Sequence, residues 1–222
     1  MSDVNVQLVR EFFELNAFHV MTYWQHDTLR PRAAEHGIQL FVENTGPELQ
    51  RSLDLVLGIG DVPAIRRAIV GVRAWHADRF YPSVIEANPV LQQIVEHESL
   101  ERARQVFGGA DWETILVISE LPASPEPRQR AIDLFREAGI GHILEFPTIL
   151  QEILHKINAH VSYATSQTLQ TLRLLKRYDF IRHQQLEFPF PTEAPLATAR
   201  PAAADAAIEI VETVHEDDET RG

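Results

Sequence analysis

A chain of 222 residues, 45% of them hydrophobic, is long and apolar enough for one packed domain. It has no cysteine, which excludes disulfides, thiolate metal sites and cysteine nucleophiles, and its formal charge of −12 offers no overall electrostatic reason to bind nucleic acid. No apolar run approaches the roughly 20 residues of a membrane-spanning helix, and no secretory signal opens the chain. We therefore expect a cytoplasmic protein with no membrane partner.

The first third of the chain predicts a helix followed by strands. From Val4 to Asn16 apolar residues recur at the i, i+3, i+4 spacing of an amphipathic helix. Phe18–Trp24 is rich in aromatic and β-branched residues, and Ile38–Val42 alternates apolar with polar or mixed residues, so both are predicted strands. The apolar segments Leu53–Leu57 and Ala68–Trp75 are two further predicted strands.

The middle of the chain carries its clearest pattern. Thr114–Ile118 is a short continuous apolar run, as in a strand covered on both faces. A predicted helix then runs from Ser124 to about Gly139, His142–Phe146 is another short strand, and Pro147 opens another helix. This alternation predicts that the two strands are parallel neighbours in an α/β sheet.

The last predicted helix spans Thr165–Tyr178. Its inward-facing residues are expected to be Leu169, Leu172 and Leu175. We predict a single α/β domain over residues 1–185. Residues 186–222 are rich in Pro and Ala and contain nine acidic against two basic side chains, so we expect a disordered acidic tail that cannot offset its ordering entropy.

Three cations lie near the end of that last helix, namely Arg173, Lys176 and Arg177. Cations at this position commonly complement the helix dipole. The alternative is a contact surface for nucleic acid or an acidic protein partner, or for the acidic tail of the chain itself.

Two other candidate motifs give weaker evidence of function. Gly58 and Gly60 follow a predicted strand, but Pro63 stands where a dinucleotide fingerprint needs its third glycine, so a turn is favoured. None of the ten histidines has the spacing of a known metal motif. We therefore assign no metal site from the sequence.

Two short segments carry a family resemblance. The strand with Asp54, followed by Val72–His76 on a second apolar strand, resembles the core of the PD-(D/E)xK nuclease superfamily. Together with the helix segment Arg10–Leu15, these residues are also similar to those of a group of uncharacterised bacterial proteins. The resemblance implies a restriction-endonuclease-like fold, a three-layer α/β structure with a mixed central sheet. A simple doubly wound α/β sheet is the alternative.

The resemblance also implies which positions would be catalytic. In that superfamily two carboxylates on adjacent strands hold a divalent cation such as Mg²⁺, and a lysine near the second helps to activate water. Asp54 matches the first carboxylate, Gly71 stands at the second, and Arg73 stands at the lysine position. A guanidinium stays protonated and cannot act as a general base. Asp54 and Arg73 are thus vestigial catalytic positions, predicted to face each other as an ion pair on antiparallel strands beside a core Trp75.

Three functions follow as hypotheses. We favour a non-catalytic or inactivated nuclease-like domain that acts as a binding or scaffold module for nucleic acid or a protein partner, without a cofactor. An active Mg²⁺-dependent nuclease or phosphodiesterase with a relocated carboxylate is the first alternative. The second is a small-ligand- or nucleotide-binding α/β domain that uses the strand ends around Ser119 and Phe146.

Overall fold

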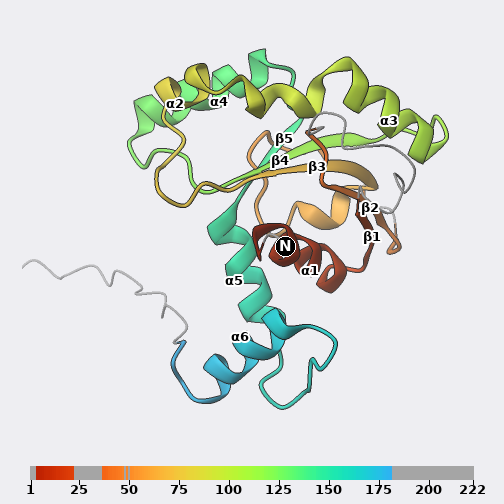
Figure 1. Ribbon diagram of the computed structural model, residues 1–222, viewed down its shortest axis with the longest axis vertical. Helices are drawn as coiled ribbons and strands as arrows, with labels where there is room; N and C mark the ends of the chain where they lie inside the picture. Colours follow the sequence, from red (N-terminus) through yellow and green to blue (C-terminus); the bar gives the residue numbers. More distant parts are fainter. Residues whose placement is uncertain (1–3, 23–36, 48, 50, 182–222) are drawn as a thin grey trace, which may run out of the picture. The chain divides into compact units, whose positions relative to one another are not determined.

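The computed structural model describes residues 4–22, 37–47, 49 and 51–181. In this part of the chain five strands alternate with helices on an α/β plan (Figure 1). The strands are β1 (Phe18–Thr22), β2 (Leu40–Asn44), β3 (Arg67–Arg73), β4 (Glu113–Ile118) and β5 (His142–Glu145). The α-helices are α1 (Val4–Leu15), α2 (Pro82–Ala87), α3 (His97–Phe107), α4 (Pro125–Glu137), α5 (Phe146–Lys156) and α6 (Gln167–Arg177), and the 3₁₀ helices are η2 (Val62–Ala64) and η3 (Pro89–Val95).

The five strands form one mixed sheet in the order β1-β2-β3-β4-β5. β1, β2 and β3 pair antiparallel, whereas β3, β4 and β5 run parallel. Val117 of β4 lies opposite Leu144 of β5, and α4 connects these two strands. The prediction that Thr114–Ile118 and His142–Phe146 are parallel neighbours in an α/β sheet is therefore confirmed.

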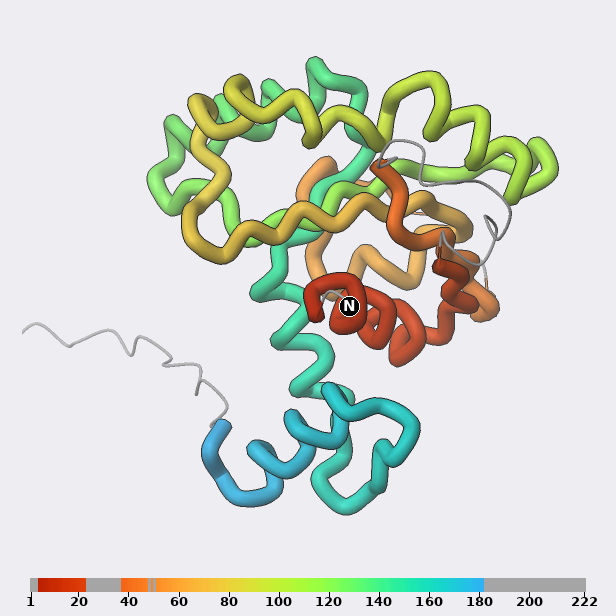
Figure 2. Tube along the Cα trace, in the orientation of Figure 1, coloured from red at the N-terminus to blue at the C-terminus, as the bar shows by residue number. Residues whose placement is uncertain are grey.

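Helices cover both faces of the sheet. Side chains alternate along a strand, so Val70 of β3 packs toward α1 and α5, whereas Ile69 packs toward α2, η3, α3 and α4. Figure 2 shows α1 and α5 side by side on their shared face, and the two helices are in direct contact. The apolar stripe of α1 is fully used there, because Val9, Phe12 and Phe13 are completely buried.

The structure corrects the prediction that Leu53–Leu57 is a strand of the sheet. Only Val56 forms a bridge, parallel to Ile143 of β5, flanked by hydrogen bonds from Ile143 N–H to Leu55 O at 2.6 Å and from Leu57 N–H to Ile143 O at 2.9 Å. The segment thus lines the free edge of β5 and does not pair with β3, whose neighbours are β2 and β4. The expected antiparallel pairing of residues 53–57 with 68–75 is wrong.

The side chain of Ser166 caps the N-terminus of helix α6. The Ser166 hydroxyl accepts from Leu169 N–H at 3.0 Å and donates to Glu11 of α1, a carboxylate that is only 1% exposed. Leu169 is buried as predicted, but Leu175 is 37% exposed, so the expectation that it faces inward is wrong. Position 176 takes its place on the packed face.

Two of the sequence predictions involve residues outside the described ranges. Residues 23 and 24 of the first predicted strand, and the predicted tail over 186–222, lie outside the described residues. Within the described residues no helix combines the length and the apolar character needed to cross a membrane.

Candidate functional site

The two vestigial nuclease positions lie far apart. Asp54 precedes the segment that lines the outer edge of β5, and its main-chain oxygen accepts from His142 Nδ1 at 2.9 Å at the start of that strand. Arg73 ends β3 at the opposite end of the parallel ladder. Three strand spacings of about 4.8 Å each separate the two segments across the sheet. The predicted ion pair between Asp54 and Arg73 is therefore wrong.

The position of the missing second carboxylate has no room for a side chain. A Cβ on Gly71 would lie 2.7 Å from Gly37 O and 3.1 Å from Ile94 Cδ1. Arg73, on the same face of β3, donates to Gln93 Oε1 at 3.2 Å and to Val72 O at 3.0 Å. η3 and the segment before β2 thus cover this face of the strand. Trp75 was predicted to be a core residue, and this is wrong. It lies beyond the end of β3, is 38% exposed and stacks on Phe80.

The cations of α6 have different environments. Lys176 Nζ donates to Leu154 O and Ile157 O, both at 2.7 Å, and so satisfies carbonyls at the carboxyl end of α5. Arg173 Nε donates to Ala159 O at 3.2 Å, whereas Arg177 is exposed. The other lysine, Lys156, similarly donates to Leu15 O at the end of α1. Lys156 and Lys176 are the only lysines of the chain, and both act as helix caps for a neighbouring helix.

A cleft of about 780 Å³ lies at the carboxyl ends of β3, β4 and β5. We call it the strand-end cleft. It is bordered by the segment after β3, the segment after β4, the start of α5 and the start of α1. Its lining residues include His76, Asp78, Arg79, Ser119, Glu120 and Phe146. The second alternative function from the sequence uses the strand ends around Ser119 and Phe146, and both residues line the cleft.

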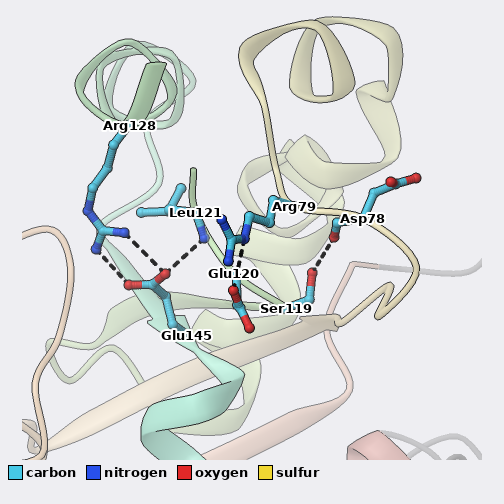
Figure 3. Close-up of polar contacts among 7 residues, drawn as sticks. All are labelled: Asp78, Arg79, Ser119, Glu120, Leu121, Arg128 and Glu145. Carbon is cyan, nitrogen blue, oxygen red and sulfur yellow. Dashed lines mark hydrogen bonds and ion pairs between the residues drawn. The ribbon is translucent and has the colours of Figure 1, made fainter. Parts of the chain in front are cut away.

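Hydrogen bonds to main-chain oxygens hold the floor of the strand-end cleft, and Figure 3 shows the one from Ser119 to Asp78. Ser119, which is 4% exposed, donates through Oγ to Asp78 O at 2.9 Å, and its main-chain oxygen accepts from Phe146 N–H at 3.1 Å. Phe80 N–H donates to Glu120 O at 2.8 Å. These bonds join the segments that follow all three parallel strands, so the floor is a rigid part of the fold.

Two ion pairs border the floor (Figure 3). Glu145, at the end of β5, accepts from both Nη atoms of Arg128 on α4 at 3.3 and 2.7 Å, and from Leu121 N–H at 2.8 Å. Its side chain is 16% exposed, and this bidentate geometry is the stronger form of an Arg–carboxylate pair. The second pair, Arg79 Nε to Glu120 Oε2 at 3.1 Å, is about half exposed on both sides.

A histidine stands on the wall of the cleft. His76 Nε2 lies 3.0 Å from Asn5 Oδ1, and its ring meets the edge of Phe146 at a centroid distance of 4.6 Å. Asn5 in turn donates through Nδ2 to Ala74 O at 3.2 Å. The first helix therefore contributes an orienting amide to a site built on the strand ends.

Sequence reasoning missed His76, Asn5 and Asp78 as site residues. A usable signal was present for two of them, because His76 and Asp78 directly follow a strand that was predicted to end near Trp75, and ligands of open α/β sheets bind beyond the carboxyl ends of strands. Asn5 is distant in sequence and had no such signal. Among the described residues, no group of three or more His, Asp or Glu side chains is placed to hold a metal ion.

Comparison of the chain with protein-family models, with curated proteins and with solved structures gave no match.

Proposed function

We propose that this chain is a small-molecule-binding module whose ligand site is the strand-end cleft. The observation that carries the proposal is the position of this cleft beyond the carboxyl ends of three parallel strands. Open α/β sheets use this edge for ligands, because strand-end loops there can vary without disturbing the sheet. Its volume of about 780 Å³ is also suited to a small molecule, since such pockets typically measure about 300–1,000 Å³.

The lining chemistry supports the same function. The lining combines the apolar residues Leu8, Phe146 and Leu150 with the charged residues Asp78, Arg79 and Glu120. An apolar surface with a few fixed polar groups is typical of a site that both buries and orients a ligand. The rigid floor beneath Ser119 means that the site is largely formed before a ligand arrives, which lowers the entropic cost of binding.

A blocking substitution tests this function. The full chain is screened by thermal shift and by NMR chemical-shift changes against amines, nucleosides, nucleoside phosphates and dicarboxylates. Ala77 is exposed and lines the cleft, so Ala77→Trp should fill the site without disturbing the core. Ala164→Trp, at an exposed loop position away from the cleft lining, is the matched control.

We expect binding of at least one class that Ala77→Trp abolishes and Ala164→Trp preserves. Ligands that bind Ala77→Trp as well as the wild type would place the site elsewhere. If the screen finds no ligand whose binding Ala77→Trp abolishes, the proposed function is refuted.

A non-catalytic nuclease-like module is the second candidate. It is supported by the succession of a leading helix, three strands, helices and a further strand, which agrees with the order implied by the resemblance. The packing at Gly71 supports the inactive rather than the active version, because a carboxylate there would collide with Gly37. We expect no cleavage of DNA or RNA with Mg²⁺ or Mn²⁺. Cleavage that is lost in Asp54→Ala would instead support an active nuclease.

A further inference from the structure

The hydrogen-bonding state of His76 follows from its neighbour. Because Asn5 Nδ2 donates to Ala74 O, the amide oxygen of Asn5 is the atom that faces His76 Nε2 at 3.0 Å. An amide oxygen only accepts, so Nε2 must carry the hydrogen. His76 therefore donates to the first helix at the wall of the cleft.

The charges that line the strand-end cleft have a negative excess. Arg79 and Glu120 neutralise each other, and Asp78 adds a carboxylate with no salt bridge among the described residues. Figure 3 shows the Asp78 carboxylate extending away from the Arg79–Glu120 pair. Glu145 below the floor is matched by Arg128. The charged lining, with two carboxylates against one guanidinium, therefore favours a cation over an anion.

The start of α5, which also borders the cleft, is a poor anion site. A helix N-terminus binds phosphate through its free N–H groups. Here Phe146 N–H is already donated to Ser119 O at 3.1 Å, and Pro147 has no N–H to offer. The N-cap residue is Glu145, whose carboxylate is paired with Arg128 and offers no donor. A phosphate group would therefore meet few free donors at this end of the helix.

We infer that the strand-end cleft takes a small organic ammonium ion. Its protonated amine pairs with the Asp78 carboxylate, and its apolar body packs against Leu8, Phe146 and Leu150. The inference rests on the proposed function and specifies its ligand class. It disfavours the nucleotide among the earlier alternatives, because a nucleotide brings two or more negative charges to a net negative surface.

Three probes with the same apolar body and different head groups test the inference. 2-Phenylethylamine is a cation, 2-phenylethanol is neutral and 3-phenylpropanoate is an anion. Titrated into the full chain by NMR at pH 7, the amine should bind about fivefold more tightly than the alcohol, which is the upper end for an exposed ion pair. The propanoate should bind more weakly than the alcohol.

Asp78→Asn removes the charge and keeps the shape. Asp78 is exposed, and Ser119 contacts its main-chain oxygen rather than its side chain. The variant is therefore expected to fold normally. It should lower the affinity for the amine about fivefold, to that of the alcohol, and leave the alcohol unchanged. Asp111→Asn, an exposed aspartate outside the cleft lining, is the control and should change neither.

The outcomes separate the two proposals. If the propanoate binds as tightly as the amine, or if Asp78→Asn leaves the preference for the amine intact, the ammonium inference is overturned. The proposed function survives that result provided that Ala77→Trp blocks the binding. If neither these probes nor the screened classes show binding that Ala77→Trp blocks, both the function and the inference are refuted.

Discussion

Replacing Lys176 with methionine should separate a structural cation from a binding one. Methionine keeps most of the aliphatic stem and removes the amine that donates to Leu154 O and Ile157 O at 2.7 Å. Two carbonyls at the end of α5 then lose a charged donor. A hydrogen bond to a charged group contributes about 1.5–3 kcal/mol, and water can replace part of it at a half-buried position, so we expect a loss of about 2 kcal/mol.

The adjacent residue supplies the control. Arg177 is exposed, lies on the same helix and makes no hydrogen bond or ion pair among residues 4–22, 37–47, 49 and 51–181. Arg177→Met removes the same charge, and its effect should stay within about 0.5 kcal/mol. In thermal unfolding followed by circular dichroism, 2 kcal/mol corresponds to a fall in Tm of roughly 4–8 °C for a chain of this size.

Equal losses in the two variants would refute the capping argument, since they would show that only the net charge matters. The same pair addresses nucleic-acid binding. Because the Lys176 amine points at α5, any salt-sensitive binding of nucleic acid by this helix should depend on Arg177 and not on Lys176.

Two further changes test the packing that surrounds the site. Gly71→Ala should cost about 3 kcal/mol in urea unfolding, because its Cβ would lie 2.7 Å from Gly37 O. Gly60→Ala, whose nearest contact would be at 3.7 Å, should cost less than about 1 kcal/mol, and similar values for the two would contradict the close approach. Ser166→Ala should cost about 2–3 kcal/mol, because it removes the α6 cap and a partner of the buried Glu11. Thr165→Ala, at the exposed neighbour, should stay within about 0.5 kcal/mol, and equal effects would exclude a special role for the hydroxyl.

The sequence pattern was sufficient to predict those elements that pack against elements next to them in the chain. The β4, α4 and β5 unit was predictable because two continuous apolar runs flank an amphipathic helix, and a parallel crossover is the common way to bury all three. The segment Leu53–Leu57 is as apolar as a strand, yet its partner is Ile143, far along the chain. Pairing it with the next strand in sequence was the usual arrangement, and here it did not apply.

The error at Leu175 has a simple geometric cause. Position 176 follows Leu169 by seven residues, close to two full turns of an α-helix, and therefore shares its face. Position 175 follows it by six residues and is turned about 120° away. Position 176 is a lysine, which lays its stem against the packed face and carries its amine to α5. A polar residue at an apolar position hid the true periodicity of α6.

The strand-end cleft was predictable only in part. Ser119 and Phe146 follow β4 and β5 directly, so the rule for strand ends identifies them. The contact of Asn5 with His76 joins residues 71 positions apart, and it depends on how α1 packs across the sheet. Tertiary packing of that kind leaves no signature in either local sequence.

The two lysines offer residue-specific reporters of the contacts that they make with neighbouring helix ends. An amine reacts with an acylating reagent only through a free lone pair, and an acyl group on either Nζ would break the hydrogen bonds to backbone carbonyls. Acylation at Lys156 therefore reports release of its amine from the end of α1, and acylation at Lys176 reports release of its amine from the end of α5. With no other lysine side chain and no cysteine in the chain, peptide mass spectrometry can follow the two helix ends separately in native protein.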